Sequence, residues 1–310
     1  MSTPPLHRLS QGVAEHYVIE RELGRGAHAT VFLARDRKHG REVALKVLRP
    51  ELAAAVGAER FAREIQLLAR LQHPHILPLY DSGQAGGALY YVMPRIEGES
   101  LRERLVREGP LPVDDALAIA RDVTEALAYA HGRGVVHRDI KPENVLLAGG
   151  HAIVADFGVA RVIERASGER HAGDRRSSDG SHDERTTDSG STVGTPAYMS
   201  PEQASGDPHV DGRTDIYALG CVLHEMLAGA PPFGGTSSRA TIARRFTEPP
   251  PSVRESRPDV PEHVDEALRR ALAPEPAERW QTAAALGEAL AVSYAVPGAW
   301  WKRLLRGWIR

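Results

Sequence analysis

The hydrophobic pattern of this 310-residue chain changes its period near residues 94–98. Before this point, short runs rich in valine and leucine are separated by glycine and charged turns, which is typical of β-strands. After it, apolar residues recur three and four positions apart, which indicates helices. Because strands and helices are segregated along the chain, we predict an α+β fold, with a small β-rich lobe followed by a larger helical lobe.

The individual elements follow from the same periodicity. Within the β-rich part, one helix is expected over residues 58–71 and is ended by His73-Pro74. The strongest later helical stripes cover residues 114–131 and 216–227. Residues 164–192 are almost entirely charged or small and polar, so we expect a long loop there.

The composition excludes several classes of protein. Hydrophobic residues make up 42% of the chain, which is enough to bury a core, and the formal net charge of -2 provides no field to attract nucleic acid. The single cysteine, Cys221, rules out an internal disulfide framework and fits a reducing compartment. We find no signal peptide and no apolar run of about 18 residues, so we expect a cytoplasmic protein that does not span a membrane.

Lysine is rare in this arginine-rich chain. Only four of the 39 basic residues are lysine: Lys38, Lys46, Lys141 and Lys302. A lysine ammonium is a compact point charge, whereas arginine carries a broad planar fork. Lys46, on a predicted strand, is therefore a candidate phosphate-binding group, although an exposed strand lysine explains it equally well when it is taken alone.

A dense polar cluster lies at residues 137–144, between two buried runs of valine and leucine. Placing this many polar groups there is costly unless each has a task. A carboxylate, an ammonium and a carboxamide at this spacing can hold a hydroxyl, a phosphate and a metal ion. Asp156 follows the next apolar strand, residues 152–155, and a carboxylate at a strand end is a natural Mg²⁺ ligand.

The segment Gly24-Arg25-Gly26 lies in a strand–turn–strand context. Its glycines allow the backbone to approach phosphate oxygens, but a tight turn alone would also explain them. No helix is expected directly after it, which argues against a dinucleotide-binding fingerprint. His28, at the tip of the turn, is expected to be exposed to solvent.

Over residues 17–292 the chain resembles the bacterial eukaryotic-like serine/threonine protein kinases. Six motifs in the family's order carry the resemblance: the Gly-rich loop, the Lys46 strand, Glu64 on a helix, His137-Arg138-Asp139, Asp156-Phe157-Gly158 and Ser200-Pro201-Glu202. The resemblance implies a bilobal fold with an N-lobe at 17–94, a C-lobe at 98–292 and a long activation loop at 156–202. Residues 1–16 would form an N-terminal extension, and residues 293–310 a tail rich in Trp and Arg.

The resemblance also assigns roles to single residues. It implies four catalytic residues, with Lys46 paired to Glu64: Asp139, Lys141, Lys46 and Glu64. It implies an ATP site formed by Leu23, Gly24, Arg25, Gly26, Ala27, His28, Ala29, Thr30, Val31, Ala44, Lys46, Met93, Ile96 and Leu146. Asn144 and Asp156 would bind Mg²⁺, for which Mn²⁺ can substitute. Structural roles would fall to His137, Phe157, Gly158, Thr195, Glu202, Asp215 and Arg279.

The activity implied is transfer of the γ-phosphoryl group of ATP to serine or threonine hydroxyls of proteins in signal transduction. Two alternatives stay open, namely a nucleotide-binding scaffold of the pseudokinase type and a small-molecule kinase of the same fold. Arg138 would bind a phosphorylated residue of the activation loop. The candidate autophosphorylation sites are Thr186, Thr187, Ser189, Ser191 and Thr192. Relatives also form homodimers.

The tail combines an apolar face with basic residues. At helical spacing, Trp301, Leu304, Leu305 and Trp308 share one face and are interleaved with lysine and arginine. This pattern is typical of a membrane-surface helix, and equally of a helix that packs on the kinase lobe or on a partner protein. Residues 296–310 are therefore expected to contact either a protein or the inner face of the membrane.

Overall fold

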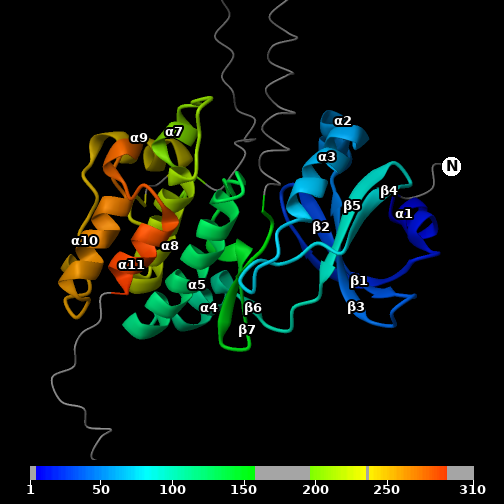
Figure 1. Cartoon of the computed structure of the whole chain (residues 1–310), viewed down its shortest axis with the longest axis horizontal. Helices are drawn as coiled ribbons and strands as arrows, with labels where there is room; N and C mark the ends of the chain where they lie inside the picture. The colour runs from blue at the N-terminus through cyan, green and yellow to red at the C-terminus, as the bar shows by residue number, and fades with distance from the viewer. Residues whose placement is uncertain (1–4, 158–195, 235–236, 292–310) are drawn as a thin grey trace, which may run out of the picture.

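The computed structural model describes residues 5–157, 196–234 and 237–291. A small lobe built on an antiparallel sheet lies beside a larger, mostly helical lobe (Figure 1), so the predicted bilobal α+β fold is confirmed. Several predicted features lie outside the described residues: Gly158, Thr195, the five candidate phosphorylation sites between 186 and 192, and the tail at 293–310.

The small lobe contains five strands and three helices among the described residues. In chain order they are α1 (Pro5–Val13), β1 (Tyr17–Arg25), β2 (Ala29–Asp36), β3 (Glu42–Leu48), α2 (Pro50–Val56), α3 (Ala58–Leu68), β4 (Asp81–Ala85) and β5 (Ala88–Pro94). The strands form one antiparallel sheet in the order β1-β2-β3-β5-β4. This order places β3, which carries Lys46, beside β5, which leads to the second lobe.

Both faces of this sheet are covered, which explains why β5 is a continuous apolar run. Successive side chains of a strand point to opposite faces. Tyr90 and Val92 accordingly pack in a cluster with α1, whereas Tyr91 and Met93 pack in the main core with α3. The tyrosines at 90 and 91 are therefore on different faces of one sheet, and only the second faces the cleft between the lobes.

The N-terminal extension predicted at residues 1–16 contains a helix that belongs to the small lobe. Leu9 and Val13 of α1 are 3% and 1% exposed and pack on the face of the sheet away from α3. Helix α1 lies along the outer side of the lobe near β4 and β5 (Figure 1). The hydrophobic pattern does not predict this helix, because nine residues are too few to show a helical period.

The predicted helix at residues 58–71 is shorter in the structure. Helix α3 ends at Leu68, with Ala69 as its C-cap residue. The chain continues as a turn to Leu71, which is still buried in the core. At its other end, Gly57 has a φ of +75°, a conformation that glycine adopts without steric cost, and separates α2 from α3.

The large lobe consists mainly of helices packed around α5 and α8. Its elements are β6 (Glu99–Ser100), α4 (Leu101–Glu108), α5 (Val113–His131), a 3-10 turn (Pro142–Asn144), β7 (Val145–Ala148), β8 (His151–Val154), α7 (Pro201–Ala204), α8 (Arg213–Ala228), α9 (Ser238–Thr247), a 3-10 turn (Val253–Glu255), α10 (Glu262–Ala271), a 3-10 turn (Pro276–Glu278) and α11 (Ala283–Leu290). In the part of the chain that the structure describes, no helix is both long and apolar enough to cross a bilayer.

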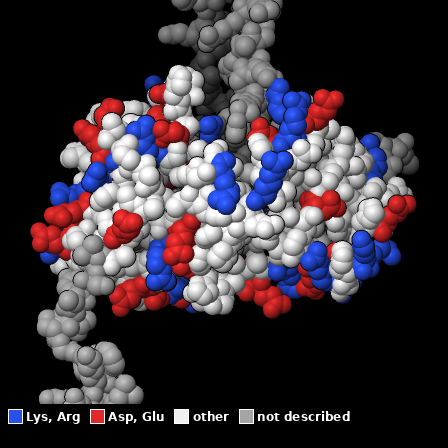
Figure 2. All heavy atoms as spheres, in the orientation of Figure 1, with Lys and Arg blue, Asp and Glu red and all other residues white. Residues whose placement is uncertain are grey.

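A three-stranded sheet, β6-β7-β8, positions the polar cluster. Residues 137–144 connect α5 to β7, and Asp156 follows the end of β8, so both groups face the cleft between the lobes. Acidic and basic side chains are interspersed over both lobes on the face shown in Figure 2, so neither charge sign dominates that face.

Candidate active site

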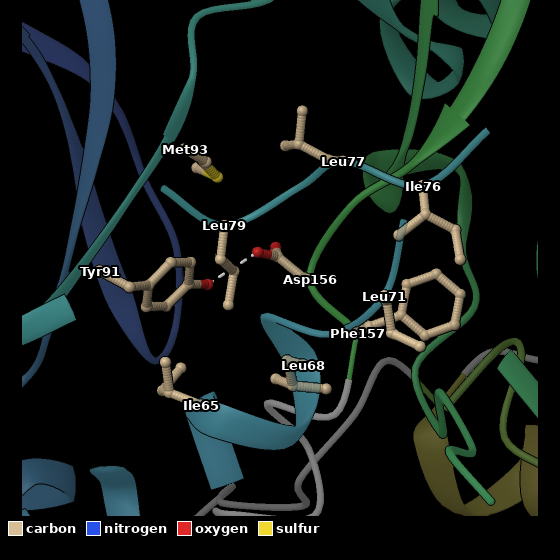
Figure 3. Close-up of a pocket in the computed structure, with 10 residues that line it drawn as sticks. All are labelled: Ile65, Leu68, Leu71, Ile76, Leu77, Leu79, Tyr91, Met93, Asp156 and Phe157. Atoms are coloured by element: carbon tan, nitrogen blue, oxygen red, sulfur yellow. Dashed lines mark hydrogen bonds between the residues drawn. The ribbon is translucent and has the colours of Figure 1, made fainter. Parts of the chain in front are cut away.

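The Asp156 carboxylate lies at the centre of the cleft and accepts hydrogen bonds from two elements of the small lobe. Its Oδ2 accepts from Lys46 Nζ on β3 at 2.5 Å, and its Oδ1 accepts from Tyr91 Oη on β5 at 2.8 Å (Figure 3). Burial alone would raise the pKa of this carboxyl group, but Lys46 and Tyr91 together hold it below its usual value. Asp156 is therefore held ionised, with both oxygens engaged.

Lys46 forms an ion pair that was not expected from the sequence, with Asp156. Asp156 holds this ammonium because its carboxylate is shielded in the cleft and is also stabilised by a second donor, Tyr91. Glu64 lies half-buried on α3, and its pairing with Lys46 stays a prediction.

The catalytic-loop candidates converge on Asp139. Lys141 Nζ donates to Asp139 Oδ2 at 2.7 Å. Asn144 Nδ2 donates to the Asp139 carbonyl at 2.8 Å and to its Oδ2 at 3.1 Å. These bonds fix the carboxylate orientation and leave the Asn144 amide oxygen as an acceptor, because only the amide nitrogen donates.

Asp215, at the start of α8, holds the backbone of this loop. Its side chain is fully buried; Oδ1 accepts from the Arg138 N–H at 2.7 Å, and Oδ2 accepts from the His137 N–H and from His131 Nε2, both at 2.8 Å. Although burial alone would raise its pKa, the His131 and His137 interactions hold the pKa below its usual value. Arg138 has a φ of +68°, an uncommon conformation for a residue with a side chain, and the Asp215 bond keeps it there.

His137 links the loop to the strand end that carries Asp156. Its Nε2–H donates to the Ala155 carbonyl at 2.8 Å, and its Nδ1 accepts from the Asp139 N–H at 3.2 Å. The edge of the ring meets Phe157, with 4.6 Å between the ring centroids. His137 is fully buried, so it acts through packing and orientation.

The predicted ATP-site residues lie on β1, β2, β3, β5 and β7 and in the segments next to these strands. The strand register pairs Gly24 with Val31 and Ala44 with Met93. Ala44 and Met93 are buried, Thr30, Val31, Ile96 and Leu146 are half-buried, and Ala29 is buried at the start of β2. Leu23, Gly24, Gly26 and Ala27 are exposed, as a loop that receives a ligand requires.

Arg25 and His28 of the Gly-rich loop differ in their exposure to solvent. Arg25 is exposed and forms an ion pair with Glu22 at 2.8 Å. His28 is half-buried, so the expectation that it is exposed is wrong. Burial lowers the pKa of His28, and the charges of Asp139, Lys141, Lys46 and Arg49 also act on this imidazole.

The last predicted pair lies at the base of the large lobe. Arg279 donates to both oxygens of Glu202 at 2.7 Å, and its side chain is fully buried. It also donates to the carbonyls of Ala273, Pro274 and Arg213. A bidentate guanidinium–carboxylate pair of this kind fixes α7 against the segment before α11.

Tyr91 is the functional residue that sequence reasoning missed. It lines a mostly apolar pocket between α3 and β5 and points its hydroxyl at Asp156 (Figure 3). A tyrosine inside the apolar run Leu89–Met93 could have indicated this role. A fully buried tyrosine usually has a hydrogen-bond partner, so a polar group was to be expected near its hydroxyl. Sequence reasoning also missed Arg102 of α4, which bonds Glu143 of the catalytic loop at 2.9 Å and Glu225 of α8 at 2.7 Å.

The donors in the cleft fit a hard divalent cation and a polyphosphate. Asp156 and Asn144 offer only oxygen atoms, the type of donor that Mg²⁺ and Mn²⁺ prefer. Lys46 and Lys141 add two ammonium groups at the same cleft. The arrangement can therefore hold a metal-bound phosphate chain beside an oriented carboxylate.

Comparison of the sequence with known protein families agrees with this geometry. The family model described as "Protein kinase domain" matches residues 17–290. The chain therefore belongs to the protein kinase family.

Its similar curated relatives are bacterial serine/threonine kinases. The chain is 37% identical over 290 residues to the serine/threonine-protein kinase PknB of Mycobacterium leprae, covering 92% of this chain and 43% of the relative. It is 40% identical over 270 residues to the serine/threonine-protein kinase PknD of Mycobacterium tuberculosis strain H37Rv, covering 86% of this chain and 38% of the relative. The chain thus spans about two fifths of the length of these relatives.

Proposed function

We propose that this chain is an ATP-dependent serine/threonine protein kinase that acts on protein substrates in signal transduction. The observation that carries the proposal is the convergence of Asp139, Lys141, Asn144, Asp156 and Lys46 on one cleft, with each side chain held by a partner. The scaffold alternative would be favoured by the loss of one of these groups, and all five are present.

The residues divide the reaction between them. Asp139, fixed by Lys141 and Asn144, orients the acceptor hydroxyl and receives its proton. Lys141 contributes positive charge where the transferred phosphoryl group becomes more negative. Lys46 holds the remaining phosphates, since its ammonium has three N–H donors and the bond to Asp156 uses one of them. Much of the rate enhancement then comes from holding the acceptor hydroxyl and the phosphate chain in the right positions relative to each other.

We propose Mg²⁺ as the metal, bound by Asp156 and Asn144, with Mn²⁺ able to replace it. When bound, the ion neutralises phosphate charge and aligns the phosphate chain. Lys46 and Tyr91 each donate to one oxygen of Asp156, so each oxygen keeps a lone pair that could bind the ion.

Regulation, localisation and assembly are proposed from the sequence. Autophosphorylation at Thr186, Thr187, Ser189, Ser191 or Thr192 would place phosphate near Arg138, whose backbone is held by Asp215. A cytoplasmic location is supported by Cys221, which is a buried free thiol. The tail at 296–310 would contact a protein or the inner membrane face, and a homodimer is the proposed assembly.

The experiment is phosphoryl transfer from labelled ATP, with Mg²⁺, by the purified chain to itself and to a general protein substrate. We expect label on serine or threonine in the wild type and a loss of at least about 100-fold in Asp139→Asn, because the oriented carboxylate is removed. Asp259→Asn is the matched control, since Asp259 is 63% exposed on the large lobe. Equal labelling by wild type and Asp139→Asn would contradict the proposal.

A further inference from the structure

Outside the kinase cleft, three elements bring two histidines and an aspartate together. His75 lies in the segment between α3 and β4, Asp122 lies on α5, and His151 is the first residue of β8. One possible ligand atom from each residue lies within 4.8 Å of the others. We call these three residues the histidine–aspartate cluster.

The two ring nitrogens of His75 face different groups. Its Nδ1 lies 2.8 Å from the Ala152 carbonyl oxygen and on the side of Asp122. Because a carbonyl can only accept, Nδ1 carries the proton here, and it would release this bond to bind an ion. Nε2 lies 3.7 Å from Glu125 Oε2 and would then carry the proton, and a metal-binding histidine usually turns its other N–H toward such an acceptor.

Asp122 is a buried carboxylate that faces these imidazoles. Its side chain is 5% exposed, and its Oδ2 accepts from the Ala152 N–H at 3.0 Å. The same oxygen lies 3.4 Å from His151 Nδ1 and 3.6 Å from His75 Nδ1. Two ligand atoms bound at about 2.0–2.1 Å to one tetrahedral ion are about 3.4 Å apart, so the cluster needs only small side-chain movements to bind an ion.

The donor types distinguish this cluster from the Mg²⁺ ligands of the cleft. Two imidazoles with one carboxylate form a set that suits Zn²⁺, an ion that three protein ligands and a water can bind. Asp156 and Asn144 offer oxygen only. His151 and Asp156 are also separated by β8, a distance on the order of 15 Å of extended chain.

We propose that His75, Asp122 and His151 form a Zn²⁺ site, in which His75 binds through Nδ1 and turns its Nε2–H toward Glu125. The ion would connect the segment before β4 with α5 and β8. That segment already bonds to β8 through the His75 carbonyl and the Leu77 N–H, each at 2.9 Å from its partner in Val154. The site therefore adds a cross-link at the junction of the two lobes, and it does not depend on the proposed kinase activity.

The test is titration of the untagged, chelator-stripped full chain with Zn²⁺ in the absence of nucleotide, followed by calorimetry. We expect one bound ion per chain and a loss of affinity of at least about tenfold in His151→Ala. His151 is 64% exposed, so this variant should fold. His209→Ala is the matched control, because His209 is exposed and lies near a single carboxylate, Asp207, at 3.5 Å. Its affinity should equal that of the wild type.

A second variant and a second probe make the result decisive. Asp122→Asn keeps the side-chain volume and should also weaken Zn²⁺ binding, and Co²⁺ should give the intense visible absorption of a tetrahedral site in the wild type only. The proposal is overturned if the wild type shows no saturable binding. It is also overturned if His151→Ala binds Zn²⁺ as tightly as the wild type, including the case in which only Asp156→Asn abolishes binding.

Discussion

At the scale of single residues, the Tyr91 hydroxyl controls the position of Asp156. The tyrosine is 2% exposed, and its hydrogen bond to Asp156 Oδ1 is 2.8 Å long. Together with Lys46 it donates to both carboxylate oxygens, so these two donors oppose any movement of the carboxylate toward a metal ion. Tyr91 is thus a positioning residue that tunes how readily Asp156 is released.

Tyr91→Phe should lower the Mg²⁺ concentration that gives half-maximal kinase activity by about three- to tenfold. The reason is that a hydrogen bond with a net value of about 0.5–1.5 kcal/mol no longer holds Asp156 away from the metal. The measurement is a Mg²⁺ titration of activity at fixed ATP.

Tyr90→Phe is the control for this prediction, because Tyr90 occupies the opposite face of the same strand. It should leave the Mg²⁺ dependence unchanged. An unchanged or increased Mg²⁺ requirement in Tyr91→Phe would show that the hydroxyl does not restrain Asp156.

At the scale of elements, α1 is held against the β4–β5 hairpin by the turn at Gly86. A Cβ at Gly86 would lie 2.7 Å from the carbonyl carbon of Arg8, which is a backbone clash. The neighbouring Gly87 also has a positive φ, +84°, but a Cβ there would meet no atom within 4 Å. Comparing substitutions at Gly86 and Gly87 therefore distinguishes the cost of backbone strain, which both share, from the cost of a clash with α1, which only Gly86 has.

Gly86→Ala should destabilise the chain more than Gly87→Ala. Both substitutions cost about 1–2 kcal/mol for the left-handed conformation, and only the first adds about 1–3 kcal/mol of overpacking against α1. Chemical denaturation gives the difference in the free energy of unfolding, and limited trypsin digestion at Arg8 reports whether α1 has detached. Equal stability and equal digestion of the two variants would mean that α1 does not rest on this turn.

The elements also show what a sequence alone can predict. The two lobes and the candidate site residues could be predicted from the change in hydrophobic period and from the order of the motifs. Such patterns, for example the apolar runs around residues 137–144, depend only on neighbours in the chain. The Lys46–Asp156 pair could not be predicted, since it depends on which of several nearby charges lies closest to Lys46 in the folded cleft. The partial burial of His28 could not be predicted either, since it depends on how the Gly-rich loop folds. Helix α1 was not predicted because nine residues contain too few apolar positions to show a helical period, although Leu9 and Val13 pack in the core.

At the scale of the whole molecule, one core cluster runs through both lobes, and the catalytic loop is fixed to the large lobe by a buried charge. Asp215 joins α8 to α5 through His131 and to the loop through the backbone of His137 and Arg138. Since its carboxylate accepts three hydrogen bonds without exposure to solvent, the ionised form is required by the folded state and not by the unfolded one.

The free energy of unfolding should therefore depend on pH through Asp215. Its pKa is lowered on folding, so its contribution is complete above the unfolded value of about 3.9 and is lost as the pH falls through the folded value. Asp215→Asn places an amide donor among N–H donors and should cost about 1.5–3 kcal/mol at pH 7. The variant should also lose stability less steeply than the wild type below about pH 4. Urea denaturation from pH 7 to pH 3 measures both effects, with Asp259→Asn as the exposed control, and parallel pH profiles for wild type and Asp215→Asn would refute the assignment.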